Sequence, residues 1–137
     1  MMQLSEHFHL SEFVRSDIAR IHDLSNVPPP EVTRKLQLMC RMVLEPVRCH
    51  IMAPIHVSSG YRSPVVNQLA GGVPSSQHCL GEAADIWTGA MDADQLFEVI
   101  QRQVPEWDQL YLNRRDAFIH ISYRLGKNRN QILPIID

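Results

Sequence analysis

A carboxylate and an imidazole each interrupt a short apolar stretch of this chain, and they constrain its fold more than any other feature. Asp85 lies in Ala83-Ala84-Asp85-Ile86-Trp87, and His120 lies among isoleucines between Phe118 and Tyr123. An unpaired buried carboxylate costs several kcal/mol or takes up a proton. The fold must therefore bring a metal ion, an arginine or a ring of backbone donors to Asp85.

The alternation of side chains along a strand separates His120 from its apolar neighbours. The two isoleucines beside it fall on one face of such a strand, whereas His120 shares the other face with Phe118 and Ser122. His120 therefore need not lie in the core and can face a cleft.

A second histidine, His78, lies in a polar loop seven residues before Asp85. Two histidines and one carboxylate from separate segments match a zinc site with three protein ligands and a fourth position for water. The spacing alone leaves two alternatives open, histidines with a structural role and a buried Asp–Arg pair. The other histidines occur in polar, helix-end or exposed contexts, and we assign them no metal. They are His7, His9, His22, His50 and His56.

Local signals predict an α+β fold in which helices precede and interrupt an antiparallel sheet. We expect a first helix capped by Ser11 and further helices over 31–47, 65–69 and 92–103. We expect strands over 55–59, 83–87, 107–112 and 117–123, of which the last two form a hairpin around the polar turn 113–116. Residues 127–137 are expected to form a loosely packed tail.

The helix over 31–47 shows the clearest apolar stripe. Its inward residues recur every three or four positions, and Pro46 should kink or shorten it near its end. The stripe consists of Val32, Leu36, Met39, Val43 and Val47. The helix over 92–103 should bury Leu96, Phe97 and Ile100.

Length and composition exclude several classes of protein. A chain of 137 residues fits one domain, which we take as residues 1–137 with a signature core over 54–123. A net charge of −2 without a basic cluster disfavours a nucleic-acid partner. No apolar run approaches the ~20 residues of a membrane span. The first twenty residues hold no secretory segment and the three cysteines no CxxC pair, so we expect the chain to be cytoplasmic as synthesised.

Several motifs taken together resemble a known family. They are S-S-G-Y-R-S-P at 58–64, S-Q-H at 76–78 with an aspartate after six more residues, and I-H-I-S at 119–122. The combination resembles the zinc D-Ala-D-Ala peptidases, which include VanX-type dipeptidases and L-Ala-D-Glu phage endolysins and share the hedgehog/DD-peptidase fold. The resemblance runs from about Leu4 to Tyr123, as in compact single-domain bacterial or prophage members.

The resemblance implies a role for each motif residue. His78, Asp85 and His120 would bind one Zn²⁺ ion, which lowers the pKa of a bound water towards ~7 and polarises the scissile carbonyl. Arg62 would bind substrate and stabilise the developing oxyanion, although a structural salt bridge is the alternative. The two residues before the first ligand would serve the substrate side, Ser76 as a contact and Gln77 as support of the loop.

The general base is where the chain departs from the family. Many relatives carry an acid three positions before the last histidine, where this chain has Ala117, and other compact relatives carry a glutamate near the position of Asn113. We predict Asp116 as the base, with an ordinary turn residue as the alternative. Further candidates are Asp108, Glu106, Tyr111 and His56.

These expectations combine into a zinc metallopeptidase that cleaves peptidoglycan stem peptides at a terminal D-Ala-D-Ala or an internal L-Ala-D-Glu bond. We expect a monomer that reaches the cell wall after lysis or export, as a prophage endolysin does. The alternative is a non-catalytic zinc-binding recognition module of the same fold, favoured by the missing acid. A structural phage component is a third interpretation.

Overall fold

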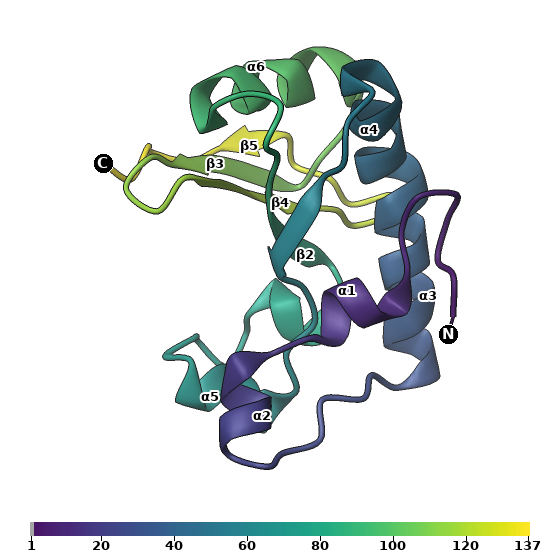
Figure 1. The fold of residues 1–137 in the computed structure, drawn as a ribbon, viewed down its shortest axis with the longest axis vertical. Helices are drawn as coiled ribbons and strands as arrows, with labels where there is room; N and C mark the ends of the chain where they lie inside the picture. The colour runs from purple at the N-terminus through teal and green to yellow at the C-terminus, as the bar shows by residue number, and fades with distance from the viewer. Residues whose placement is uncertain (1) are drawn as a thin grey trace.

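A five-stranded sheet in the order β1-β2-β4-β3-β5 forms the centre of the computed structural model, which describes residues 2–137 (Figure 1). The strands are β1 (His56–Ser59), β2 (Ala83–Trp87), β3 (Gln109–Asn113), β4 (Phe118–Ser122) and β5 (Gln131–Ile132). Every neighbouring pair is antiparallel except β3 and β5, which run parallel. The α+β class with a mainly antiparallel sheet is confirmed.

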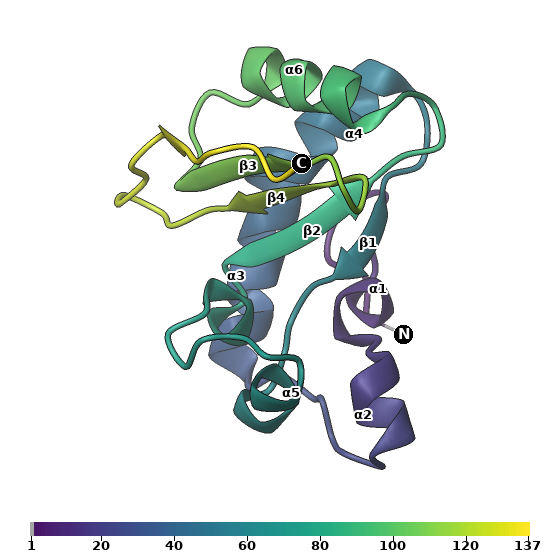
Figure 2. The same ribbon diagram turned by 90° about the vertical axis from the view of Figure 1, so that its left-hand side faces the viewer.

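The helices gather on one face and at the two ends of the sheet. They are α1 (Leu10–Val14), α2 (Asp17–Ile21), α3 (Pro30–Met39), the π-helix η1 (Cys40–Leu44), α4 (Glu45–Ile51), α5 (Pro64–Leu69), the 3₁₀ helix η2 (Gln77–Leu80) and α6 (Ala93–Gln103). Figure 2 shows the sheet in front of α3, with α6 above it and α2 and α5 below.

The hydrophobic core lies between the sheet and the helix that runs through α3, η1 and α4. The predicted stripe from Val32 to Val47 is buried throughout and packs in one cluster with Ile86, Ile119 and Ile121. From α6, Leu96 and Ile100 join this cluster as predicted, whereas Phe97 is only partly buried and Val99 is buried beside them. The apolar face of β4 is therefore the face without His120.

Of the two outcomes expected at Pro46, a kinked or a shortened helix, the shortening is wrong, because the helix continues to Ile51. Proline lacks an N–H group, and its ring clashes with the carbonyl of residue i−4 in an α-helix. The wider turn of η1 comes immediately before, where the backbone N–H of Glu45 donates to the carbonyl of Cys40, five residues back. This extra residue in the turn accommodates the proline ring.

The expected first helix is two short helices, and Ser11 caps neither of them. The backbone is extended at Arg15, with ψ of 128°, and the chain starts again at Ser16, whose Oγ accepts from the N–H of Ala19. Ser63 before α5 and Asp92 before α6 cap their helices in the same way. Inside a helix, serine and aspartate side chains compete with the backbone for its hydrogen bonds, whereas at the start of a helix they stabilise it. Ser16-Asp17 therefore divides the expected first helix into two.

The C-terminal segment is docked on the sheet, which corrects the expectation of a loosely packed tail. Its backbone N–H groups at Gln131, Leu133 and Ile136 donate to carbonyls of 108, 110 and 112 along β3. This pairing joins residues about 22 positions apart in the sequence, so no local pattern predicts it. Over the described residues 2–137, no helix is both long enough and apolar enough to cross a bilayer.

Replacing Gly60, which follows β1, should destabilise the protein. A Cβ at this position would lie 2.6 Å from the carbonyl oxygen of Phe13 and 2.7 Å from its Cα, so α1 or the end of β1 must shift. We expect Gly60→Ala to lower the free energy of unfolding by about 1–3 kcal/mol in urea titrations. Gly89→Ala is the matched control, because a Cβ there meets nothing within 4 Å. Equal midpoints for the two variants would contradict this packing.

Candidate metal centre

The residues on the open face of the sheet form a row across four strands. Asp85 on β2 pairs with Ser59 on β1 and with His120 on β4, and His120 pairs in turn with Tyr111 on β3. Directly paired residues of an antiparallel sheet point to the same face. His120 therefore points to the face opposite Ile119 and Ile121, as the alternation predicts, and the register brings it to Asp85.

His78 reaches this row from η2, a turn that sequence reasoning treated as loop. Ser76 begins the turn with its Oγ accepting from the N–H of His78, and Gly81 ends it with a left-handed φ of 73°. The Nδ1–H of His78 donates to the carbonyl of Gly60 at 2.7 Å. Because a carbonyl only accepts, this bond fixes a proton on Nδ1 and turns Nε2 of the same ring towards Asp85.

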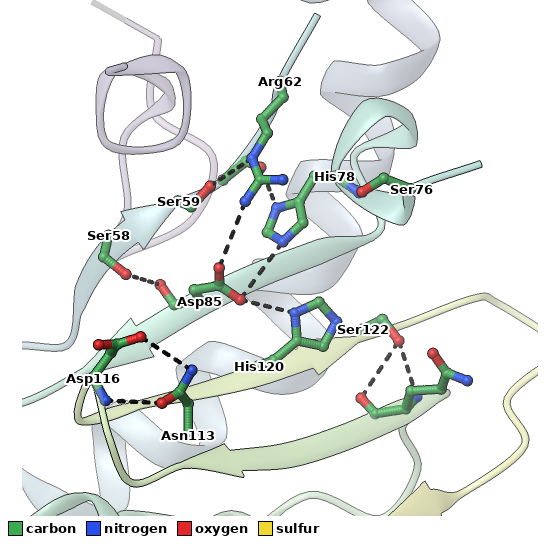
Figure 3. A network of polar contacts seen from close by, with 12 residues as sticks. Ser58, Ser59, Arg62, Ser76, His78, Asp85, Asn113, Asp116, His120 and Ser122 are labelled. Atoms are coloured by element: carbon green, nitrogen blue, oxygen red, sulfur yellow. Dashed lines mark hydrogen bonds and ion pairs between the residues drawn. The ribbon is translucent and has the colours of Figure 1, made fainter. Parts of the chain in front are cut away.

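The three residues form a compact donor set (Figure 3). Asp85 Oδ1 lies 2.8 Å from His120 Nδ1 and 3.6 Å from His78 Nε2, and one ligand atom from each residue lies within 4.8 Å of the others. Neighbouring ligand atoms of tetrahedral zinc, with bonds of 2.0–2.1 Å, are about 3.3 Å apart. Two imidazoles and one carboxylate at these separations fit a zinc ion.

Asp85 is ionised at neutral pH although it is only 7% exposed. Burial alone would raise the pKa of its carboxyl group, but hydrogen bonds with His120 and His78 outweigh burial and lower the pKa to about 2. Asp85 is therefore a buried negative charge, and the compensating groups that the sequence led us to expect surround it.

Arg62 adds a cation to the same carboxylate. Its Nη2 lies 3.9 Å from Asp85 Oδ2 and its Nε donates to Ser59 Oγ (Figure 3). Its Nη1 donates to Asn67 Oδ1. The structure thus contains both arrangements that the spacing left open, the histidine cluster and an Asp–Arg pair. Because the Arg62 side chain is 21% exposed, the rest of its guanidinium can meet a ligand.

Two cavities flank the group. Arg62 lines one of about 540 Å³ with Ser58, His56 and Trp87. Ser76, Gln77 and His120 line the other, of about 440 Å³. Asp85 contacts both Arg62 and His120, so the candidate metal centre lies between the two cavities.

Gln77 is held by a buried ion pair that the sequence did not reveal. Its Nε2 donates to Oδ2 of Asp108, which is fully buried and also accepts from Nε and Nη2 of Arg129. The hydrogen bond from Arg129 outweighs burial and lowers the pKa of Asp108 to about 2. Asp108 therefore fastens the η2 turn to the C-terminal segment.

Tyr111, named from the sequence only as one residue that could assist, lies against the metal group. Its ring stacks on His120 at 4.8 Å with 13° between the planes. Burial and the charge of Asp85 raise the pKa of the Tyr111 phenol, which stays protonated and able to donate. Its place depends on the pairing of β3 with β4, which the sequence of either strand alone does not give.

The predicted base, Asp116, lies apart from this group in the hairpin turn. β4 begins at Phe118, so the alternation that would align Asp116 with His120 does not extend to it. Its carboxylate is 57% exposed and contacts Asn113 and Arg115 at 3.5 Å. Of the other candidates, Glu106 is exposed, and the His56 ring lies tilted against Trp87 with the ring centroids 4.4 Å apart.

The Asp108–Arg129 pair should make stability depend on pH. Because the pKa of Asp108 is lower in the folded protein than its ordinary 3.8, its contribution is complete above that value and is lost as the pH falls towards 2. We expect Asp108→Asn to lower the free energy of unfolding at pH 7 by about 2 kcal/mol, measured in urea. The loss should shrink at acidic pH.

Asp94→Asn is the matched control, since Asp94 also pairs with an arginine, Arg114, but on the surface. An exposed pair contributes little, so no measurable change is expected. Similar losses in both variants, or an Asp108→Asn deficit that persists at low pH, would contradict the assignment.

Comparison with known proteins agrees with this geometry. The profile described as peptidase M15 matches residues 6–122, a span that includes the metal group and Arg62. No curated protein matches the chain at a significant level. Members of the M15 family are zinc-dependent, act on peptide substrates and have the hedgehog/DD-peptidase fold. Since the match covers most of the chain, the protein belongs to the peptidase M15 family.

Proposed function

We propose that the protein is a zinc peptidase that hydrolyses an amide bond in peptidoglycan stem peptides. The observation that carries this proposal is the convergence of His78, Asp85 and His120 beside Arg62, between two cavities. Membership of the M15 family supports peptide hydrolysis as the reaction class. The cell wall as the source of the substrate rests on the sequence motifs.

The donor set determines what each residue contributes. His78, Asp85 and His120 would hold the ion, and a zinc ion there supplies Lewis acidity that activates water and polarises a carbonyl. The Arg62 guanidinium donates in a fixed fork, which suits a carbonyl oxygen that becomes negative during the reaction. The protonated phenol of Tyr111 offers one further donor beside His120.

The two cavities favour an internal bond. A carboxypeptidase needs room for a long substrate on only one side of the scissile bond, because a single residue leaves from the other side. Here a cavity of about 540 Å³ borders Arg62 and another of about 440 Å³ borders His120. We therefore favour the L-Ala-D-Glu type of cleavage over release of a terminal D-Ala.

A second candidate function is recognition of a wall peptide without cleavage. The position of Asp116 favours it, because that carboxylate is exposed in the turn and does not face His120. A metal group without a proton acceptor would bind a carbonyl and leave the peptide intact.

The zinc-loaded protein should cleave walls and defined stem peptides, and His78→Ala should lower the rate at least about 1,000-fold. Loss of a ligand removes several kcal/mol of charge stabilisation, and each 1.36 kcal/mol is a factor of ten. New amino termini and free D-Ala are measured separately, and amino termini without D-Ala identify an internal bond. His50→Ala, at an exposed position on α4, is the matched control and should cleave at the normal rate. Bound zinc without cleavage in the unmodified protein would overturn the peptidase and support recognition.

Arg62→Lys should lower kcat about 10²–10³-fold while zinc stoichiometry stays at its normal value. Lysine keeps the positive charge but loses the fork that spans Ser59, Asn67 and Asp85. Steady-state kinetics on the cleaved peptide and metal analysis of the same samples measure both effects. Arg20→Lys, at an exposed position on α2, is the control. A change confined to zinc content would show that Arg62 supports only the metal group.

A further inference from the structure

A second group of metal-ligating side chains lies where the N-terminal turn meets α4. It consists of His7, Glu45 and Cys49, and one ligand atom from each residue lies within 4.8 Å of the others. It shares no residue with the His78–Asp85–His120 group. The sequence alone assigns His7 no metal, because it occurs in a polar context.

The helix supplies two of the three donors. Glu45 and Cys49 are four residues apart on α4 (Glu45–Ile51), and this spacing places their side chains one above the other on the same face. Cys49 is exposed and forms no disulfide. A thiol and a carboxylate are thus presented together on the outside of the helix, where an ion can enter.

The N-terminal turn supplies the third donor and fixes the carboxylate. Glu45 Oε1 lies 2.6 Å from His7 Nδ1, while Oε2 accepts from the backbone N–H of His7 and from Ser5 Oγ. The turn is itself anchored, because Leu4 and Phe8 are each 1% exposed in the core. His7 and Glu45 are therefore brought together by the fold before any ion binds, which lowers the entropic cost of binding.

We propose that His7, Glu45 and Cys49 bind a second zinc ion, which ties the N-terminal turn to α4. Imidazole, carboxylate and thiolate are the three ligand types that zinc accepts in proteins, and water completes the coordination of a site with three protein ligands. Binding displaces the thiol proton of Cys49, while the neutral His7 ring keeps its single proton on the nitrogen that does not bind the ion. A hydrogen bond alone would explain why His7 and Glu45 lie together. The thiol of Cys49 adds a third metal-ligating atom, so that the group can chelate an ion.

Sulfur distinguishes this site from the first, which contains only nitrogen and oxygen ligands. Cobalt(II) replaces zinc in such sites, and a thiolate ligand adds a near-ultraviolet charge-transfer absorption. The unmodified protein, reduced with a phosphine and titrated with Co²⁺, should bind two ions per chain and show this absorption. Cys49→Ser should bind one ion and lose the absorption, and its thermal midpoint should no longer rise with the second equivalent of Zn²⁺.

Two control variants separate this proposal from the proposed function. Cys79→Ser removes another thiol that is not fully buried and should keep the absorption, whereas His78→Ala should bind one ion and still show it. Cys49 lies outside the machinery around His78, so Cys49→Ser should cleave peptides as the unmodified protein does. Absence of thiolate absorption in the cobalt-loaded protein, or its persistence in Cys49→Ser, would overturn the second site whatever the outcome of the hydrolysis assay.

Discussion

A carboxylate in the middle of a sheet must be surrounded by donors, and the partners of Asp85 come from every segment that borders the open face. His120 arrives by strand register, His78 from η2, and Arg62 from the segment after β1. A divalent ion would satisfy the carboxylate and both imidazoles at once, so the constraint that organises this face also suits it to hold a metal. Removing any one partner leaves a buried charge less compensated.

Hydrogen bonds to the backbone set the distance between Arg62 and His78. The N–H of Arg62 donates to the carbonyl of His78, and the carbonyl of Gly60 accepts from the His78 ring. On the other side of the same segment, the N–H of Tyr61 donates to Phe13, and the Asn26 side chain binds the Tyr61 carbonyl and the Ser63 N–H. The N-terminal helices therefore belong to the site although they contribute no ligand.

The features that could be predicted from the sequence are those set by local chemistry. The apolar residues around Asp85 and His120 predict the two strands and the face of the sheet on which each side chain lies. Ser63 and Asp92 mark the starts of two helices. Non-local pairings were not predictable from the same signals. The docking of β5 and the Asp108–Arg129 pair depend on segments about 20 residues apart, and Tyr111 reaches His120 only through the register of the hairpin.

The turn between β3 and β4 shows where backbone requirements and catalysis compete for the same residues. Asn113 is buried and its Oδ1 accepts from the N–H of Asp116, while Ala117 adopts a left-handed φ of 58°. Both positions at which relatives carry an acid are thus occupied by residues that close the turn.

Asp116 carries the one carboxylate in this turn, and only weak contacts hold that carboxylate in place. Its contacts of 3.5 Å are long, and its surface hollow is lined by Ser58 and Trp87, which also line the Arg62 cavity. A peptide lying along that cavity would pass the turn, so its binding energy could offset the small cost of drawing the carboxylate inwards. Asp108, by contrast, is fully buried and would have to give up its pairing with Arg129 to act as a base, so of these two carboxylates Asp116 would be the less costly proton acceptor.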